Sequence, residues 1–287
     1  MPNRFLITGI TGTLGTKITE KLLERDPEAR IIGISRDEQK QMAFPIKDSR
    51  VRLKMADVRD YHSLRSALPS QRFDVIFHLA ALKCQPQLED NPGEAIATNI
   101  KGTNNVLILA GATGAKVCFT SSDKAVYPIN IYGHTKAAGE KLVSHHSGRN
   151  TICRYGNVIG SRGSFFPQLV KSLKEEKKAY LTHPEMTRFW LTIDQVADFV
   201  IGSALHNHGL CIPKMESSYV VQFIGKTAEA LGIKDYETIR TGMRPGEKLH
   251  EHITTRYESG TNDITSEDSL MTDRALTQMV EAALGYL

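Results

Sequence analysis

Short apolar runs recur through the first 160 residues, with helix-like segments between them. The runs are RFLITGI, ARIIGISR, VRLKMADV, DVIFHLAA, KVCFTSS and TICRYGNV. The segments expected to be helical cover residues 13–25, 61–68, 92–111 and 130–147. Because short buried strands that alternate with helices pair in parallel, the pattern predicts an α/β fold, a doubly wound parallel sheet with helices on both faces.

Beyond residue 160 the regular alternation weakens. Helices are expected near residues 164–177, 194–206, 217–231 and 272–285. The polar run ESGTNDITSEDS, residues 258–269, is expected to be a mobile loop. We therefore predict a nucleotide-binding domain over residues 1–160. Residues 161–287 are predicted to form mainly a smaller substrate-binding lobe, from which some segments return to the first domain.

Spaced glycines follow the first apolar run and open the first expected helix. Glycine at such a turn lets the backbone approach a pyrophosphate at a helix N-terminus. A tight turn without a ligand is the alternative, but the strand before the glycines and the helix after them favour a Rossmann-like dinucleotide site. The predicted cofactor contacts in this turn are Gly9, Thr11, Gly12, Thr13, Leu14 and Gly15.

The second apolar run ends without the acidic residue that usually binds the ribose 2′-hydroxyl of NAD. Arg36, helped by Ser35 and Lys40, can instead hold a 2′-phosphate, which favours NADP. In the alternative, Arg36 is a solvated loop cation and Asp37 binds the ribose. Further cofactor contacts are predicted at the ends of the third and fourth runs, at Asp57, Val58, Ala80 and Ala81.

Residues 121–136, SSDKAVYPINIYGHTK, place an acid, a base and a Tyr-x-x-x-Lys pair close together. Tyr132 and Lys136 lie four residues apart, so on a helix they share a face and the ammonium can lower the pKa of the phenol. Tyr132 can then accept a proton from a substrate hydroxyl while a nicotinamide accepts hydride from the same carbon. Both residues are also predicted cofactor contacts. For Asp123 and Lys124 the alternative is a surface turn.

Seven stretches of the chain, from Thr8 to Glu251, together resemble the extended short-chain dehydrogenases/reductases. More narrowly, they resemble the inverting UDP-N-acetylglucosamine 4,6-dehydratases of bacterial nonulosonate and capsule polysaccharide biosynthesis. The stretches are TGITGTLG at 8–15, SRDEQKQ at 35–41, HLAALKCQP at 78–86, SSDKAVYPINIYGHTK at 121–136, RYGNVIGSRGS at 154–164, TRFWLT at 187–192 and RPGEKLHE at 244–251.

The resemblance implies a role for each residue of the catalytic segment. Tyr132 would be the base for oxidation at sugar C4, Lys124 would remove the C5 proton, and Asp123 would protonate the departing C6 hydroxyl. Protonation of C5 on the opposite face would account for inversion. Ser122 stands where the family commonly has threonine and keeps the hydroxyl. Lys124 must be partly neutral to act as a base, which requires burial or a nearby positive charge such as that of Lys136.

The resemblance also implies a substrate, UDP-N-acetylglucosamine or a related nucleotide sugar. Its pyrophosphate and uridine call for converging cations and amides. An aromatic neighbour is expected to restrict the guanidinium of Arg188. Glu247 is expected to bind the uridine ribose, and Arg162 to touch either substrate or cofactor. The residues implied to lie near the substrate are Lys83, Asn157, Arg162, Arg188, Arg244 and Glu247.

Composition excludes several other classes of partner. The net charge of +4 is spread along the chain, which gives no reason to propose nucleic acid. The cysteines show no metal-ligand spacing, so reduced thiols and no metal are expected. No stretch approaches the roughly 20 apolar residues of a membrane helix, and no signal peptide is recognisable, which predicts a soluble cytoplasmic protein without membrane contact. The resemblance implies a homo-oligomer.

Three rival functions share parts of this pattern. A UDP-sugar 4-epimerase would have the same fold, glycine loop, Tyr132 and Lys136, but it needs no C5 base, so Asp123 and Lys124 argue against it. A retaining dehydratase would more typically carry an acidic pair in their place. A non-catalytic NADP-sensing regulator could also use this fold, although an intact Tyr132 and Lys136 oppose that reading.

Overall fold

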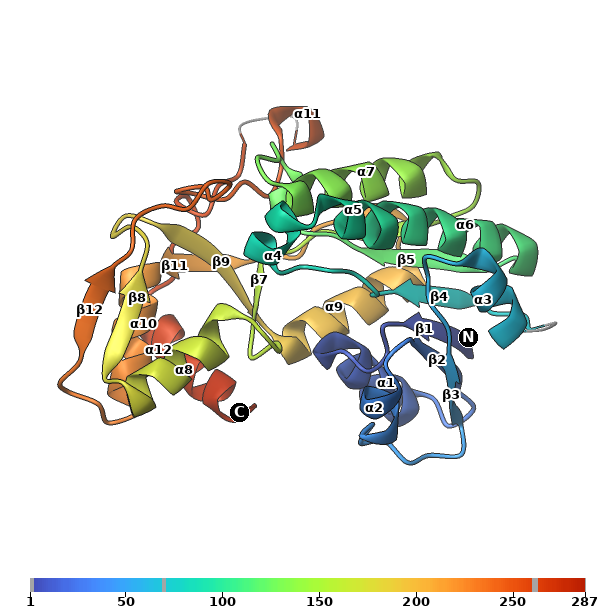
Figure 1. Cartoon of the computed structure of the whole chain (residues 1–287), viewed down its shortest axis with the longest axis horizontal. Helices are drawn as coiled ribbons and strands as arrows, with labels where there is room; N and C mark the ends of the chain where they lie inside the picture. Colours follow the sequence, from blue (N-terminus) through green and yellow to red (C-terminus); the bar gives the residue numbers. More distant parts are fainter. Residues whose placement is uncertain (1–2, 69–70, 260–262, 287) are drawn as a thin grey trace.

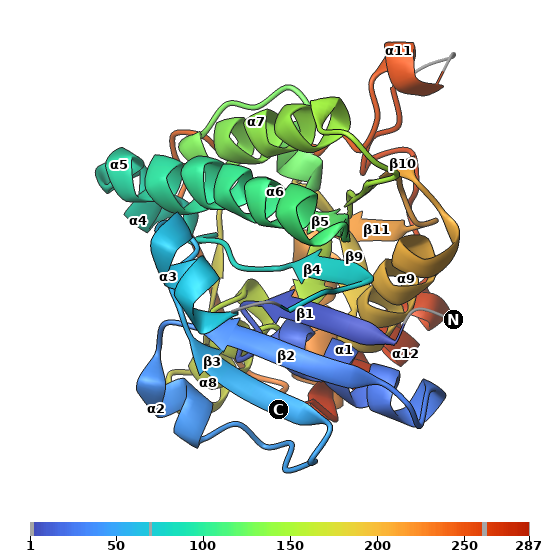
Figure 2. The same cartoon turned by 90° about the vertical axis from the view of Figure 1, so that its right-hand side faces the viewer.

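The computed structural model describes residues 3–68, 71–259 and 263–286. Within these ranges, seven strands form one sheet in the order β10-β6-β5-β4-β1-β2-β3, with every neighbouring pair parallel (Figure 2). The predicted doubly wound, Rossmann-like fold is confirmed. The strands are β1 Arg4–Thr8, β2 Arg30–Ser35, β3 Val51–Met55, β4 Val75–His78, β5 Lys116–Thr120, β6 Thr151–Cys153 and β10 Gly209–Cys211.

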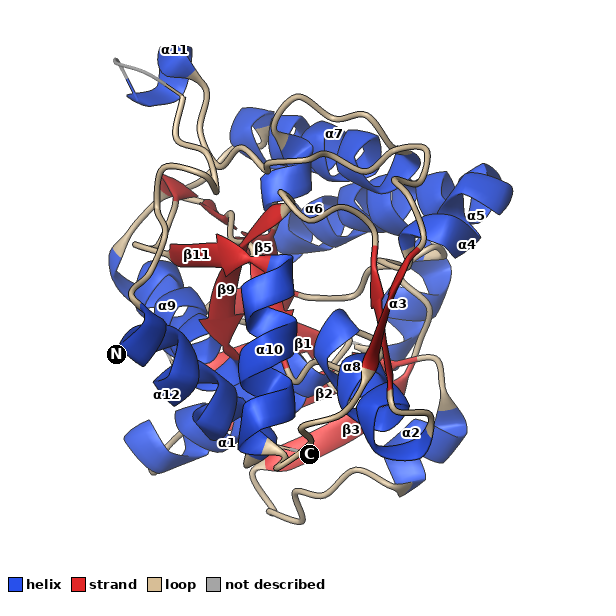
Figure 3. Cartoon of the chain, turned by 90° about the vertical axis from the view of Figure 1, so that its left-hand side faces the viewer, coloured by secondary structure: helices blue, strands red, loops and turns tan. Residues whose placement is uncertain are grey.

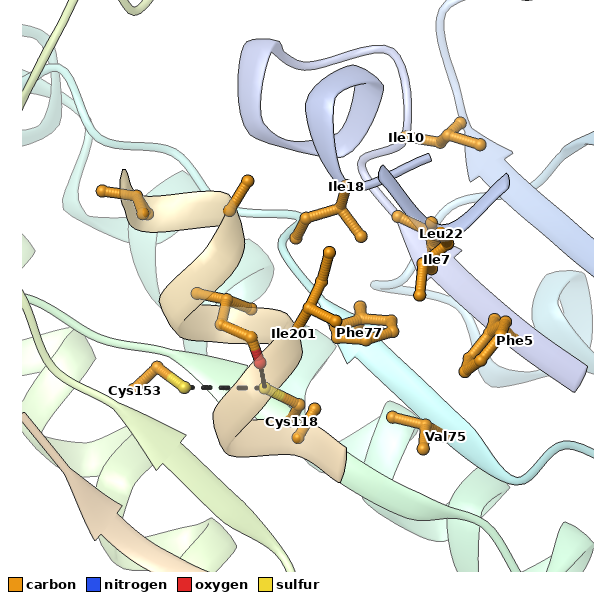
Figure 4. Packing of buried hydrophobic residues seen from close by; sticks show 14 of the residues in the cluster. Phe5, Ile7, Ile10, Ile18, Leu22, Val75, Phe77, Cys118, Cys153 and Ile201 are labelled. Atoms are coloured by element: carbon orange, nitrogen blue, oxygen red, sulfur yellow. Dashed lines mark hydrogen bonds between the residues drawn. The ribbon is translucent and has the colours of Figure 1, made fainter. Parts of the chain in front are cut away.

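Helices cover both faces of this sheet (Figures 1 and 2). Side chains alternate along a strand, so in β4 Phe77 packs towards one face and Ile76 towards the other. Figure 4 shows the first face, where Ile18 and Ile201 pack against Phe77. The helices of that face are α1 Thr13–Arg25 and α9 Ile193–His206, and those of the opposite face are α3 Tyr61–Ala67, α6 Gly102–Thr113 and α7 Ile131–His145.

The helix predicted over residues 92–111 is divided. It consists of α5 Pro92–Ala95, a π-helical turn η1 Ile96–Lys101, and then α6, while α4 Gln85–Asp90 precedes it. Asn99 in η1 is buried and its side chain binds the backbone of Leu82 and the hydroxyl of Thr135. Wide helical turns of this kind often occur beside functional sites. Here the turn ties the segment after β4 to α7.

A smaller lobe lies beside the carboxyl ends of the parallel strands (Figure 3). In the described part of the chain it has a three-stranded sheet and a two-stranded sheet, packed with helices. Its strands are β7 Asn157–Ile159, β9 Thr187–Thr192 and β11 Glu216–Tyr219, with β8 Lys178–Leu181 and β12 Glu237–Arg240. Its helices are α8 Phe165–Glu175, α10 Val220–Ala230 and α12 Asp273–Leu284.

The chain passes back from the small lobe to the large sheet. After β9 it enters α9, which packs on α1, and then β10, which pairs with β6 at the edge of the large sheet. The division at residue 160 stays a prediction. Among the described residues, no helix is both long and apolar enough to cross a membrane. The short helices not yet placed are α2 Glu38–Met42, η2 Asp123–Ala125 and α11 Arg256–Ser259.

Strand β9 lies between two hydrophobic cores. Phe189 and Leu191 belong to the core under α1 and α9, whereas Trp190 between them belongs to the core of the small lobe. Trp190 stacks on Phe223 of α10 with ring centroids 4.3 Å apart. All six residues of β9 are buried, so one strand contributes alternate side chains to the two cores.

The predicted mobile loop over residues 258–269 is only partly described, because residues 260–262 lie outside the described ranges. After that gap the chain is bonded to the fold rather than free. Thr265 forms a β-bridge with His252, and Ser266 is fully buried. The sequence did not reveal this, because a polar run resembles a loop until its long-range partners are known.

Candidate active site

A cleft of about 1050 Å³ lies where residues of the small lobe face the carboxyl ends of the large sheet. Doubly wound sheets bind their ligands at this end of the strands. The predicted site residues that line the cleft are Gly9, Gly12, Thr13, Leu14, Gly15, Ala81, Lys83, Ser122, Lys124, Tyr132, Lys136, Asn157, Arg162, Arg188, Arg244 and Glu247. The other predicted residues, all within the described ranges, are outside its lining: Thr11, Ser35, Arg36, Lys40, Asp57, Val58, Ala80 and Asp123.

The glycine turn is packed too closely for side chains. Gly9 has a φ of +71°, and a Cβ atom there would lie 2.9 Å from the backbone nitrogen of Ala80. At Gly15 a Cβ atom would lie 2.6 Å from the carbonyl oxygen of Ile10. The turn therefore keeps bare backbone facing the cleft at the start of α1, as a bound pyrophosphate requires.

Arg162 connects the loop after β7 to this turn. Its guanidinium donates to the carbonyl oxygen of Thr11, and its backbone nitrogen donates to the hydroxyl of Thr13 at 3.1 Å. Lys83 lies nearby, with its Nζ donating to the hydroxyl of Ser161 at 3.1 Å. Burial, with a further contribution from Arg162, lowers the pKa of Lys83. Two cations therefore lie on the cofactor side of the cleft.

The end of β2 carries the residues predicted to select the cofactor. The hydroxyl of Ser35 accepts from Thr11 at 3.0 Å. The guanidinium of Arg36, about half exposed, lies 3.5 Å from the carboxylate of Asp57. Lys40 instead pairs with Asp37 at 2.7 Å. Arg36 is thus the cation placed beside Asp57, another predicted cofactor contact.

Two small residues predicted to contact the cofactor are held by the core. Val58 is buried in the core under α3 and α6, and its carbonyl oxygen accepts from Asn105 at 2.9 Å. Its side chain therefore faces away from the cleft. The backbone nitrogen of Ala80 donates to the hydroxyl of Thr8 at 3.2 Å, which fixes the turn after β4.

The acid–base segment forms a short helical turn, η2, directly after β5. Ser122 caps it, accepting from the backbone nitrogen of Lys124 at 3.2 Å and donating to Asp123 Oδ1 at 2.7 Å. The Nζ atom of Lys124 lies 3.0 Å from Asp123 Oδ1, 3.1 Å from Asn157 Oδ1 and 3.3 Å from Glu251 Oε1. The pair is not the surface turn of the alternative reading.

The charges of this cluster differ from those expected for a neutral lysine. Burial disfavours the ammonium of Lys124, but Asp123 and Glu251 outweigh that effect and raise the pKa of Lys124. Burial raises the pKa of Asp123, and nearby Glu251 adds to the rise, although Lys124 opposes it. The positive charge that favours the neutral amine of Lys124 is that of Arg188 rather than Lys136, and together with burial it is outweighed by the two carboxylates.

Tyr132 and Lys136 both line the cleft, as four-residue spacing on α7 predicts. Lys136 Nζ donates to the carbonyl oxygen of Thr120 at 2.8 Å and lies 4.6 Å from the ring centre of Phe119. Burial lowers the pKa of Lys136 to about 8. Burial raises the pKa of Tyr132 to about 12, and the cation that opposes the rise is Lys124 rather than Lys136. The predicted direct effect of Lys136 on the phenol is not found in this structure.

Arg188 is held by backbone oxygens rather than by its aromatic neighbours. Its guanidinium donates to the carbonyl oxygens of Thr187, Lys248 and Leu249 at 2.7 to 3.1 Å. Trp190 is engaged elsewhere, since its indole donates to Ser218. The expectation of an aromatic restraint on Arg188 is therefore wrong, and the arginine instead fixes the segment that follows residue 247.

The far end of the cleft combines polar and apolar walls. Arg244 donates its backbone nitrogen to the carboxylate of Glu247 at 3.0 Å, and both residues face the cleft. The apolar wall suits a flat ring, while the cations of the cleft suit an anionic linker. Its residues include Phe165, Phe166, Leu169, Met186, Trp190 and Val220.

Glu251 is the main site residue that the sequence did not single out. It is the last residue of RPGEKLHE, is 2% exposed, and lies against Lys124 across the cleft floor. Neither periodicity nor spacing links it to Lys124. The sequence offers one signal for Glu251. It is a charged residue close to the apolar Ile253, and it ends the stretch RPGEKLHE that contributes to the family resemblance.

Disulfides and groups of metal-ligating side chains are not found in the part of the chain that the structure describes. Cys84, Cys118, Cys153 and Cys211 form no disulfide there. No group of three His, Cys, Asp or Glu residues is placed to hold a metal ion, within the same described ranges. The cleft therefore offers acid–base groups, cations and a dinucleotide turn as its chemical resources.

Comparison with known proteins agrees with this geometry. A family model described as "Polysaccharide biosynthesis protein" matches residues 5–272. A UDP-N-acetylglucosamine 4,6-dehydratase (inverting) of Campylobacter jejuni is 38% identical over 275 residues, 88% of this chain and 80% of the relative. A UDP-glucose 4-epimerase of Rickettsia bellii is 35% identical over 269 residues, 88% of this chain and 78% of the relative.

A solved structure, that of Pen from Bacillus thuringiensis, has the same fold. It superposes with a TM-score of 0.91 at 29% identity, covering 100% of this chain and 99% of that one. The resemblance to inverting dehydratases, first based on seven short stretches, is confirmed over most of the chain. The protein therefore belongs to the polysaccharide biosynthesis protein family, within the extended short-chain dehydrogenases/reductases.

Proposed function

We propose that this protein is an NADP-dependent UDP-N-acetylglucosamine 4,6-dehydratase that inverts the sugar at C5. The observation that carries the proposal is the contact of Lys124, which lines the same cleft as Tyr132, with Asp123 buried behind the cleft wall. Their Nζ and Oδ1 atoms are 3.0 Å apart, and the carboxyl group is fully buried. A base next to an acid at this position is what removal of a C5 proton and a C6 hydroxyl requires.

We assign each side chain the role that the family resemblance implies and that its position supports. Tyr132 accepts the proton of the C4 hydroxyl. Lys136, on the same helix, donates a hydrogen bond to the carbonyl oxygen of Thr120. A nicotinamide cofactor held at the turn of Gly9, Gly12 and Gly15 would supply the hydride chemistry at C4 and C6. Lys124 removes the C5 proton, which the C4 ketone makes acidic, and Asp123 protonates the departing hydroxyl. Protonation of C5 from the opposite face then gives the inverted 4-keto-6-deoxy sugar.

The cleft residues fit a nucleotide sugar. Lys83 and Arg162 approach it on the cofactor side, and Arg244 faces it at the far end. Cations at several points suit a substrate with a diphosphate linker, because charge-assisted hydrogen bonds to phosphate are strong. We assign Lys83, Asn157, Arg162, Arg188, Arg244 and Glu247 to substrate binding, with Arg162 also reaching the cofactor turn.

The preference for NADP over NAD rests on Arg36. Its guanidinium pairs with Asp57 at 3.5 Å but is about half exposed, so its exposed side can meet a 2′-phosphate. We expect Arg36→Ala to weaken NADP binding at least tenfold while leaving NAD binding little changed, since a charged hydrogen bond contributes about 1.5–3 kcal/mol. Arg274→Ala, on exposed α12 of the small lobe, is the matched control. Unchanged NADP binding in Arg36→Ala would show that Arg36 is a solvated cation and would assign the ribose to Asp37 instead.

A UDP-sugar 4-epimerase is the second candidate, because relatives with that name also match most of the chain. An epimerase needs Tyr132 and the nicotinamide but no base at C5. The buried contact of Lys124 with Asp123 therefore favours dehydration. A non-catalytic regulator would not need Tyr132 to face the same cleft as the glycine turn.

The deciding experiment is incubation of purified protein with UDP-N-acetylglucosamine and NADP in D2O, followed by NMR and mass analysis of the sugar. A dehydratase gives loss of water, deuterium at C5 and an inverted centre, and Lys124→Ala abolishes all three. A C4 epimer of unchanged mass would assign the epimerase. Bound NADP without any change in a panel of UDP-sugars would assign the regulator.

A further inference from the structure

Glu251 is a buried carboxylate for which the proposed reaction has no step. Its Oε1 atom lies 3.3 Å from Lys124 Nζ and 3.9 Å from Arg188 Nε, and its Oε2 atom lies 3.7 Å from Lys248 Nζ. Oε2 accepts no hydrogen bond from any residue that the structure describes. Burying a carboxylate costs several kcal/mol, so the three cations must offset that cost.

The backbone of Glu251 is fixed from two sides. Its nitrogen donates to the hydroxyl of Ser266 at 2.9 Å, and its carbonyl oxygen accepts from the nitrogen of Ser266 at 2.8 Å. The hydroxyl of Ser266 in turn donates to the carbonyl oxygen of Thr187 in β9. Arg188 binds the carbonyl oxygen of Lys248, three residues earlier. These bonds fix the backbone of Glu251, so its short side chain starts from a defined position beside Lys124.

Three oxygens surround the ammonium of Lys124, which donates hydrogen bonds to Asp123 and Asn157 and forms an ion pair with Glu251. An ammonium has three N–H donors, and the oxygens of Asp123, Asn157 and Glu251 lie within 3.0 to 3.3 Å of Nζ. With these three contacts, the lysine cannot rotate freely. Glu251 supplies the third oxygen, from a segment far along the chain.

We propose that Glu251 is a positioning residue for the acid–base step, which holds Lys124 against Asp123 so that one proton can pass between them. The inference rests on the proposed dehydratase function. Transfer of a proton from Lys124 Nζ to Asp123 Oδ1 converts an ammonium and a carboxylate into an amine and a carboxylic acid. Those are the base and the acid that the elimination needs.

The step is balanced without an external acid. The amine of Lys124 takes the C5 proton, and the electrons of that C–H bond form a C5–C6 double bond as the C6–O bond breaks. Asp123 gives its proton to the departing hydroxyl, which leaves as water. Lys124 ends as an ammonium and Asp123 as a carboxylate, as before the transfer. Glu251 stays ionised throughout, because Arg188 and Lys248 also neutralise it.

The charge of Glu251 acts on both partners in the same direction. A nearby negative charge favours the protonated form of any group, so Glu251 favours a proton on Lys124 and on Asp123. The charged and titratable groups that face this cluster come from several elements. They are Asp123 and Lys124 of η2, Tyr132 of α7, Arg188 of β9, and Lys248 with Glu251 itself.

The first test is titration of the Lys124 ammonium by NMR in protein labelled with 15N-lysine, with the signal assigned through Lys124→Met. We expect the midpoint to move to lower pH in Glu251→Gln. Glu267→Gln, which removes an exposed carboxylate beside Ser266, should leave it unchanged. An unmoved midpoint in Glu251→Gln overturns the inference, whether or not the protein dehydrates a sugar, so this result is separate from the test of the proposed function.

The second test is the pH dependence of dehydration. We expect Glu251→Gln to lose about tenfold or more in kcat, part of the roughly 100- to 10,000-fold that positioned acid–base groups contribute. Its profile should also move to lower pH, with KM little changed. A merely structural role would lower the rate equally at every pH, and that result would overturn the inference. If Glu251→Gln does not fold, Glu251→Asp replaces it, with a smaller shift expected in the same direction.

Discussion

The pKa of Lys136 shows how strongly the surroundings of a side chain can change its protonation. Its side chain is almost fully buried, and its ammonium is bonded to the carbonyl oxygen of Thr120 above the ring of Phe119. Burial lowers its pKa from 10.5 to about 8, because the charged form is poorly solvated there. The unfolded chain therefore binds more protons than the folded protein between these two pH values.

This difference predicts how stability depends on pH. Stability rises with pH wherever the unfolded state binds more protons, so the contribution of Lys136 should increase from pH 8 to 10.5. Relative to Lys136→Met, the free energy of unfolding of the wild type should rise by roughly 3 kcal/mol over that interval. Urea unfolding at a series of pH values measures it, with exposed Lys171→Met as control. Parallel curves for wild type and Lys136→Met would contradict the shift.

At the scale of single residues, the sequence predicted which residues line the cleft better than it predicted which charged groups act on one another. The four-residue spacing correctly places Tyr132 and Lys136 on one wall of the cleft, because helical geometry fixes it. It could not show that Lys124 is the cation acting on Tyr132, or that Glu251 acts on Lys124. Those relations depend on distances between segments that only the folded chain brings together.

At the scale of elements, two helical glycines illustrate opposite packing demands. Gly139 in α7 lies against Phe119, where a Cβ atom would be 2.6 Å from the ring. Gly202 in α9 has no heavy atom within 4 Å of the corresponding position, among the contacts of the described residues. α7 must therefore approach β5 closely at Gly139, whereas α9 has room at Gly202.

The same substitution should then have opposite effects in the two helices. Gly139→Ala should destabilise the protein by about 1–3 kcal/mol through overpacking. Gly202→Ala should stabilise it by about 0.5–1 kcal/mol, because alanine loses less backbone entropy in a helix. Urea unfolding followed by circular dichroism measures both changes. A stabilising Gly139→Ala would show that α7 can move away from β5 at little cost.

Several predicted helix bounds agree closely with the structure in both lobes, with 194–206 and 272–285 within one residue of α9 and α12. The predicted helices 13–25 and 130–147 agree with α1 and α7 to within two residues, because apolar periodicity and clear starts mark them. The π-helical turn η1 was not predicted, since its sequence IATNIK is compatible with an ordinary helix. The bonds of Asn99 to Leu82 and Thr135 that accompany it are tertiary contacts.

At the scale of the whole molecule, β9 joins the two lobes. Because Phe189 and Trp190 point into different cores, loss of this strand would expose both. We expect the lobes to unfold together. The sole tryptophan, Trp190, reports the small lobe by fluorescence, and the buried thiols of Cys118 and Cys153 report the large one by their reactivity.

The measurement is urea unfolding followed by both probes, which should give coincident transitions. Phe189→Ala should lower both midpoints equally, at a cost of about 3–5 kcal/mol. Val221→Ala, at an exposed position of α10, should change neither. The lobes would unfold independently if the two probes gave separate midpoints in the wild type. The same would follow if Phe189→Ala lowered only the midpoint that the thiols report. The division of the chain at residue 160 and the homo-oligomer both remain predictions.

The bonds of Glu251 and Ser266 determine how late in synthesis the acid–base cluster can form. Synthesis proceeds from the N-terminus, and early domains can begin to fold on the ribosome. The glycine turn, Tyr132, Asp123 and Lys124 emerge together in the first half of the chain. A nascent chain that ends before residue 251 can therefore present the dinucleotide turn while Lys124 still lacks its contact with Glu251. Translation thus completes the cofactor-binding turn well before it completes the acid–base cluster.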